Sequence, residues 1–195
     1  MGDRRPRPLR LRSSRRTIVL AELKARCDDL AAVRAQLRGR ARHERTVRQI
    51  DTYFVVSRGR LKLREARGTA QLIYYERPNL AAAKRSDVVV VPVRADGALR
   101  ALLEQALGVR AMVAKTRESW RWRGVQVLLD TVDGLGTFVE LKKVVRGRRA
   151  LTAASRELTA LRQQLGLAAA AVQARSYGDL LARRRRRYQA PPNTS

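Results

Sequence analysis

Residues 17–26 read TIVLAELKAR, a stretch in which apolar side chains alternate with polar and charged ones. Successive side chains of a β-strand point to opposite faces, so this pattern predicts a strand with two different faces. One face would carry only apolar residues: Val19, Ala21, Leu23 and Ala25. The other would place two opposite charges side by side: Leu20, Glu22, Lys24 and Arg26.

Three further segments carry two charges at positions i and i+2, namely Lys62/Arg64, Lys115/Arg117 and Glu140/Lys142. Such faces either lie in solvent or converge inside a closed barrel. Spacing alone favours solvated faces, because burying so many charges is costly without a partner. A polyphosphate with bound divalent cations would be such a partner, since cations pair with phosphate oxygens and carboxylates bind the metal.

The composition fits one basic globular domain. The chain has 195 residues and 45% hydrophobic residues, which suits a single packed core. It carries 43 Lys and Arg against 17 Asp and Glu, a net charge of +26, so we expect a polyanionic partner. Aromatic residues make up only 5%, which argues against a nucleic-acid binder built on base stacking.

The termini concentrate part of the charge. We predict a domain over 17–182 between basic tails at 1–16 and 183–195, and the second tail contains the run Arg183 to Arg187. These tails could attract nucleic acid. For 1–16 we favour a solvated tail or a start codon assigned too early. A mitochondrial transit peptide, and hence the mitochondrial matrix, is the alternative to a cytoplasmic location.

Cysteine usage and hydropathy support a cytoplasmic protein. Cys27 is the single cysteine, so no intrachain disulfide can form, and His43 is the single histidine. We expect Cys27 to be a small apolar residue at a strand end and His43 to lie at the surface. No apolar run approaches the length of about 20 residues that a membrane span needs.

The remaining pattern predicts eight strands and several helices. Strands are expected at 17–26, 46–56, 60–64, 71–75, 87–94, 109–117, 120–129 and 136–145. Helices are expected at 30–37, 96–107 and 151–165, and a short one starts at 177–181. Pro92 suggests an edge or a bulge in its strand. The fold class is therefore α+β, an eight-stranded antiparallel β-barrel with flanking helices.

A family resemblance adds to this interpretation. The segment AELKAR (21–26) resembles the ExExK strand that opens the CYTH family, the triphosphate tunnel metalloenzymes. The similarity continues in order through QIDTYF (49–54), GRLKLRE (59–65), LIYYERP (72–78), VAKTRESW (113–120), LLDTVDGLGTFVEL (128–141) and SYGDLL (176–181). It covers about 17–182 and is closest to class IV adenylate cyclases, whose signature reads LDxVxGLGxFxE.

The resemblance implies a barrel in which basic residues bind a triphosphate and acidic residues bind Mg²⁺ or Mn²⁺. The phosphate binders would be Lys24, Lys62, Arg64, Arg77, Lys115 and Arg117, with Lys24 and Arg117 also catalytic. The metal ligands would be Glu22, Asp130 and Glu140. The triphosphate would be ATP, thiamine triphosphate or tripolyphosphate. Asp51 would either support the tunnel or have a plain structural role.

Two positions depart from the family pattern. Leu20 stands where the first Glu of ExExK is expected, and Lys142 stands at the second acid of the closing E-x-E pair. Leu20 cannot bind a metal, and an ammonium at Lys142 would repel Mg²⁺ but could pair with phosphate.

Three hypotheses follow from these patterns. The first is a metal-dependent adenylate cyclase or triphosphatase. The second is a protein that binds a nucleotide or polyphosphate without turnover, because two metal-ligand acids are replaced. The third is a nucleic-acid-associated protein that works through its basic tails.

Overall fold

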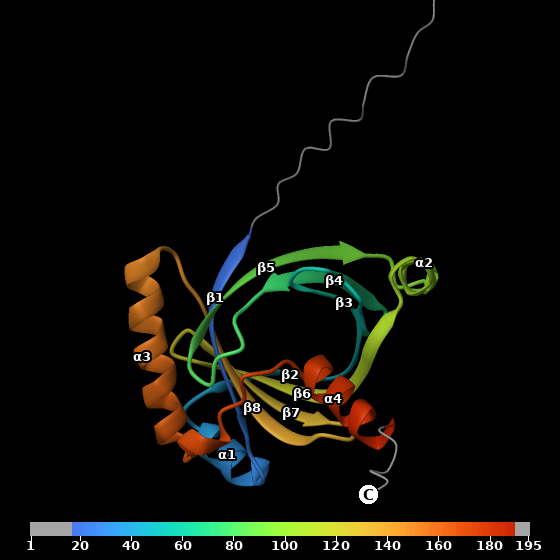
Figure 1. Cartoon of the computed structure of the whole chain (residues 1–195). Helices are drawn as coiled ribbons and strands as arrows, with labels where there is room; N and C mark the ends of the chain where they lie inside the picture. The colour runs from blue at the N-terminus through green and yellow to red at the C-terminus, as the bar shows by residue number, and fades with distance from the viewer. Residues whose placement is uncertain (1–16, 190–195) are drawn as a thin grey trace, which may run out of the picture.

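The computed structural model describes residues 17–189, so the predicted N-terminal tail at 1–16 and residues 190–195 lie outside the described part. Eight strands form a closed barrel in the order β1-β5-β4-β3-β2-β6-β7-β8 (Figure 1). Every neighbouring pair is antiparallel. The strands are β1 (Ile18–Arg26), β2 (Arg42–Phe54), β3 (Arg60–Ala66), β4 (Thr69–Glu76), β5 (Lys84–Val93), β6 (Val109–Trp122), β7 (Val125–Val132) and β8 (Gly136–Val144). The predicted α+β barrel with eight antiparallel strands is confirmed.

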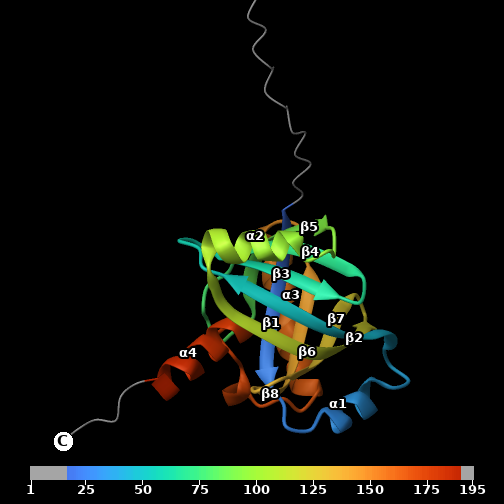
Figure 2. The same ribbon diagram turned by 90° about the vertical axis from the view of Figure 1, so that its right-hand side faces the viewer.

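Four α-helices and one 3₁₀ turn surround the barrel: α1 (Leu30–Leu37), α2 (Ala98–Leu107), α3 (Arg148–Gln164), η1 (Ala169–Ala171) and α4 (Tyr177–Gln189). Helix α3 lies along the outside of the barrel next to β1, and α1 and α2 lie on opposite sides of the molecule (Figures 1 and 2). Asp29 caps α1 by accepting a hydrogen bond from the backbone N–H of Ala32 at 2.9 Å.

The main apolar core lies outside the barrel, between its wall and the helices. The apolar face of β1, with Ala21, Leu23 and Ala25, is buried in one cluster with Leu158 and Leu161 of α3. Val127 and Leu141 from β7 and β8 join the same cluster. The charged faces of these strands therefore point inward. The spacing alone had favoured solvated faces, which is wrong, because α3 and α1 cover the apolar faces instead.

Three strands begin three or more residues away from the predicted position. The expected strand at 120–129 is wrong in its start: Trp120 and Trp122 belong to the long strand β6, and β7 begins at Val125. The two-residue turn between them is Arg123-Gly124, with φ of +47° and +80°. Such a turn needs positive φ at both central residues, which arginine seldom adopts, so Arg123-Gly124 is only a weak turn signal.

The other two boundaries concern β2 and β5. Strand β2 begins at Arg42, so His43 lies within the strand rather than before it, and β5 begins at Lys84 within the expected loop 76–86. Pro92 is paired with Gln71 of β4, but the pairing of β5 with β1 ends at Val88. The proline therefore lies where one side of β5 has no β1 partner, as an edge position requires.

The expectations for Cys27 and His43 are confirmed. Cys27 is buried directly after β1, and His43 is exposed and packs edge-on against the buried Trp120 with ring centroids 4.8 Å apart. The run Arg183 to Arg187 continues helix α4. Within residues 17–189, no helix is both long and apolar enough to cross a membrane.

Candidate functional site: a charged tunnel

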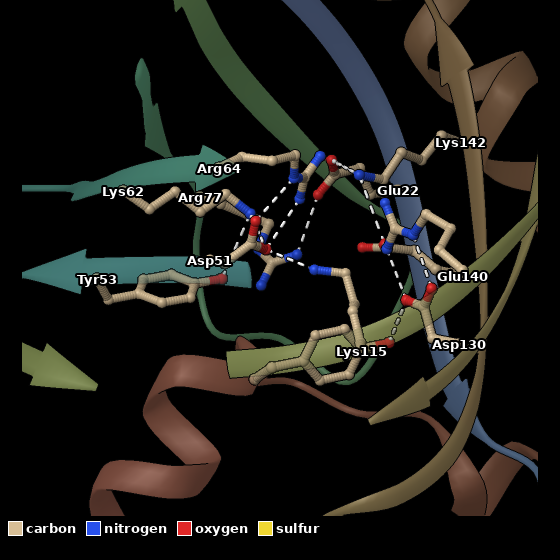
Figure 3. Close-up of polar contacts among 12 residues, drawn as sticks. Glu22, Asp51, Tyr53, Lys62, Arg64, Arg77, Lys115, Asp130, Glu140 and Lys142 are labelled. Atoms are coloured by element: carbon tan, nitrogen blue, oxygen red, sulfur yellow. Dashed lines mark hydrogen bonds and ion pairs between the residues drawn. The ribbon is translucent and has the colours of Figure 1, made fainter. Parts of the chain in front are cut away.

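A cavity of about 240 Å³ lies inside the barrel, and charged side chains dominate its wall. Eight basic residues line it, and three acidic ones: Lys24, Arg45, Lys62, Arg64, Arg77, Lys115, Arg117 and Lys142, with Glu22, Asp51 and Glu140. They come from strands all around the barrel because the inward positions recur at every second residue. Figure 3 shows ten site residues, which gather in two groups around Asp51 and around Glu22 and Glu140.

The first group is built around the carboxylate of Asp51, which is fully buried. It accepts hydrogen bonds from Lys62 at 3.0 Å, from Arg64 at 2.7 and 2.9 Å and from Lys115 at 2.6 Å (Figure 3). Asp51 on β2 and Arg64 on β3 are cross-strand partners, and this pairing brings their side chains together. One acid thus holds three of the predicted phosphate-binding cations in place.

Burial and charge act against each other in this group. Burial raises the pKa of Asp51, but the charges of Arg64, Lys62 and Lys115 outweigh it and hold that pKa well below its usual range. Burial lowers the pKa of Lys115 to about 8, although Asp51 opposes the shift. Burial and the neighbouring Arg64 lower the pKa of Lys62 well below its usual value. Three cations on one acid therefore leave positive charge uncompensated.

The second group joins β1, β6, β7 and β8. Arg117 donates to Asp130 at 2.6 Å through two nitrogens and to Glu140 at 2.8 Å. Arg77, just after β4, donates to Glu22 at 3.0 Å. Tyr177, the first residue of α4, donates its hydroxyl to Asp130 at 2.8 Å. Each of the three predicted metal-ligand carboxylates is therefore already bonded to an arginine.

Lys142 lies between two of these carboxylates. Its ammonium is 3.5 Å from an oxygen of Glu22 and 3.5 Å from an oxygen of Glu140 (Figure 3). Burial raises the pKa of Glu140, but the charges of Lys142, Lys24 and Arg117 hold it well below its usual range. Both glutamates are thus ionised and already neutralised by side chains of this protein.

Lys24 is placed differently from the other cations. Its ammonium lies 3.7 Å above the centre of the Tyr177 ring, a cation–π contact, and no carboxylate of residues 17–189 is within ion-pairing distance. Burial lowers the pKa of Lys24 to about 7, and the charge of Glu140 partly opposes this. Lys24 therefore lacks a direct ion-pair partner among residues 17–189, although Glu140 is its cross-strand neighbour.

The structure brings all the residues singled out from the sequence to this one site. The six predicted phosphate binders, with Glu22 and Glu140, line the cavity, and Asp130 lies behind Arg117. Sequence reasoning gave no role to Tyr177, Gln49, Tyr53 and Ser86, which also line the cavity. Gln49, Asp51 and Tyr53 alternate on β2, and that spacing was the available signal. The side-chain oxygens of Gln49 and Ser86 are buried with no hydrogen-bond partner among the described residues.

The residues present do not fit a divalent metal in the way the resemblance implied. Leu20 lies on the cavity wall but offers no ligand atom, and Lys142 brings an ammonium to the remaining glutamates. Within residues 17–189, no group of three or more His, Cys, Asp and Glu side chains is arranged to hold a metal ion. The predicted use of Mg²⁺ or Mn²⁺ therefore finds no prepared carboxylate cluster in this arrangement.

A closed eight-stranded barrel with a polar, strongly cationic interior is the class of structure that this chain adopts. Comparison with family models assigns the chain more closely: the CYTH domain model matches residues 21–177. The chain belongs to the CYTH domain family. No curated protein sequence matches it.

Solved structures agree on the fold. The PH1012 protein of Pyrococcus horikoshii OT3 is 20% identical, with a TM-score of 0.73 over 83% of this chain and 98% of that one. A putative adenylate cyclase of Vibrio parahaemolyticus is 23% identical, with a TM-score of 0.71 over 84% and 97%. A chain of the Schizosaccharomyces pombe Mediator head module is 8% identical, with a TM-score of 0.56 over 76% and 94%. At these identities the likeness concerns the fold alone.

Proposed function

We propose that this protein binds the triphosphate of a nucleotide or a similar small molecule inside its barrel. The observation that carries the proposal is the charge of the cavity wall, where eight Lys and Arg face three acids. Arg45 is exposed and Asp130 offsets part of the charge from behind Arg117, but cations remain in excess inside the barrel. Such an excess is unfavourable without a polyanion, and a triphosphate supplies several anionic oxygens in a row. Membership in the CYTH family supports the same ligand class.

Each group of the site has a part in this proposal. The phosphate oxygens would accept hydrogen bonds from Lys62, Arg64 and Lys115. These side chains would either leave Asp51 or stay bonded to it at the same time. Arg117 would bind a phosphate oxygen while its hydrogen bonds to Asp130 and Glu140 fix its orientation. Lys24 forms no ion pair with a carboxylate of the described residues, so it would bind phosphate without first breaking such a pair.

Lys24 offers a clean test because its removal leaves no carboxylate unpaired. In Lys24→Met we expect unchanged or higher thermal stability and a loss of about 10- to 100-fold in affinity, as for one charged hydrogen bond of about 1.5–3 kcal/mol. Isothermal titration calorimetry with tripolyphosphate, ATP and thiamine triphosphate measures it. Arg40→Met, at an exposed residue, is the matched control. Absence of binding by the folded wild-type protein would refute the proposal.

The same samples report on turnover. Mass spectrometry of the reaction mixtures distinguishes three outcomes: cyclic AMP with pyrophosphate for a cyclase, terminal phosphate for a triphosphatase, and unchanged ligand for a binding protein. Because each predicted metal ligand is bonded to a cation, we favour binding without turnover. Product formation would leave triphosphate binding intact and add an activity to it.

A further inference from the structure

The position of Lys142 points beyond triphosphate binding itself. Lys142 lies two residues after Glu140 on β8 and directly across from Glu22 on β1, so all three side chains point into the barrel. Its ammonium is 3.5 Å from one oxygen of each glutamate. Two buried carboxylates on neighbouring strands thus share one lysine.

Two ionised carboxylates so placed repel each other unless a cation lies between them. Here Lys142 lies between them. Arg77 donates to the other oxygen of Glu22 at 3.0 Å, and Arg117 donates at 2.8 Å to the same oxygen of Glu140 that Lys142 faces. A divalent ion at this position would face three cationic side chains. Side chains of the protein itself therefore supply the positive charge between and around the two glutamates.

Lys142 also has capacity left for a ligand. An ammonium carries three N–H donors, and each glutamate, an ion-pair partner at 3.5 Å, can engage at most one of them. The side chain is 21% exposed and forms part of the cavity wall, so the third donor is available to a phosphate oxygen. A lysine in this position can bridge carboxylates and phosphate, as a metal ion would.

We propose that this protein binds its triphosphate without a divalent cation, and that the Lys142 ammonium performs the charge-bridging part of a metal between Glu22, Glu140 and the ligand. This inference rests on the proposed triphosphate binding. In this respect the chain would differ from the metal-dependent binding that its family resemblance implies.

The first experiment is calorimetric titration of the wild-type protein with tripolyphosphate, in EDTA and in excess Mg²⁺. We expect the affinity in EDTA to equal or exceed that in Mg²⁺, because Mg²⁺ only competes for the free ligand. Binding that requires Mg²⁺ would overturn this inference and leave the proposed function standing. Absence of binding in both buffers would instead overturn the proposed function.

The second experiment reverses the charge at the bridge. In Lys142→Glu, three carboxylates meet without the ammonium, so we expect the affinity in EDTA to fall at least tenfold and Mn²⁺ to restore it. Electron paramagnetic resonance of Mn²⁺ alone, without phosphate, should detect binding to Lys142→Glu and none to the wild type. Equal Mn²⁺ binding by both proteins would contradict the inference.

Two further variants secure the comparison. Arg40→Glu makes the same change in net charge at an exposed residue and should behave as the wild type in both measurements. Lys142→Gln removes the ammonium without adding an acid, and it serves if Lys142→Glu does not fold. We expect it to lose at least tenfold in affinity in EDTA, and unchanged affinity would contradict the role of Lys142.

Discussion

At the scale of single residues, acids in this barrel serve to hold cations. Asp51 is fully buried and bonded to Lys62, Arg64 and Lys115. Asp130 accepts hydrogen bonds from Arg117 and from the hydroxyl of Tyr177. A buried carboxylate in such a network orders long, flexible side chains that would otherwise repel each other. The acids therefore preorganise a site that has room for a larger anion.

This arrangement makes Asp51 a competitor of the ligand. In Asp51→Asn, three buried cations lose their acid, and we expect a loss of about 3–5 kcal/mol in the free energy of unfolding without ligand. Tripolyphosphate can replace the lost charge, so its stabilising effect should be larger than in the wild type. Urea denaturation with and without tripolyphosphate measures both quantities.

The control for this variant is Asp133→Asn, which removes the exposed partner of Arg48. We expect its unfolding midpoint to stay close to that of the wild type, with or without tripolyphosphate, since exposed ion pairs contribute little. If Asp51→Asn were as stable as the wild type, Asp51 would not be holding the cations as described.

At the scale of elements, the spacing of charges predicted the two faces of the strands but not which face lies inside, which only the family resemblance indicated. The period of two in residues 20–26 separates Glu22 and Lys24 from Leu23 and Ala25 whichever way the sheet curves. Only α3, whose Leu158 and Leu161 cover the apolar side of the barrel, decides the direction. The placement of Lys142 between Glu22 and Glu140 depends on the pairing of β1 with β8, which no local pattern specifies.

Helix α4 illustrates a contact that sequence could not reveal. A Cβ at Gly178 would lie 2.8 Å from the Tyr53 ring, so the helix can approach β2 this closely only with glycine there. Tyr177, one residue earlier, depends on that approach to reach Asp130. Nothing in SYGDLL separates this glycine from one that serves a turn.

We therefore predict that Gly178→Ala moves the start of α4 away from the barrel. Overpacking of this kind costs about 1–3 kcal/mol in the free energy of unfolding, which urea denaturation can measure. Arg183→Ala, at an exposed position on the same helix, should change it by less than about 0.5 kcal/mol. Equal stability of the two variants would show that α4 is not held by this close contact.

At the scale of the whole molecule, closure of the barrel puts the cations of many strands into one small volume. Lys24 comes from β1, Lys62 from β3, Lys115 from β6 and Lys142 from β8, and the strand order brings them around a single cavity. Burial lowers the pKa values of Lys24, Lys62 and Lys115, so the free protein holds some of these protons weakly. A bound polyanion should hold them more tightly, and this links ligand binding to pH.

The final prediction is therefore that triphosphate binding takes up protons. In the free protein, burial lowers the pKa of Lys115 to about 8 and that of Lys24 to about 7. Bound phosphate favours the charged ammonium and raises both pKa values, so each lysine gains a proton on binding at a pH between its free and bound pKa. As pH rises above about 8, affinity should fall by up to about tenfold per pH unit for each proton taken up.

Calorimetry with ATP between pH 7.5 and 9.5 checks this, in two phosphate-free buffers with different ionisation enthalpies, and the protonation of the free ligand is titrated separately at each pH and subtracted. The buffer dependence of the heat gives the number of protons. Lys115→Gln should take up fewer protons than the wild type at pH 9, because one titrating ammonium is missing. The variant should keep the fold, because Asp51 retains Lys62 and Arg64 as partners. Binding without proton uptake at pH 9 would mean that these lysines are already charged in the free barrel, or that they do not meet the ligand.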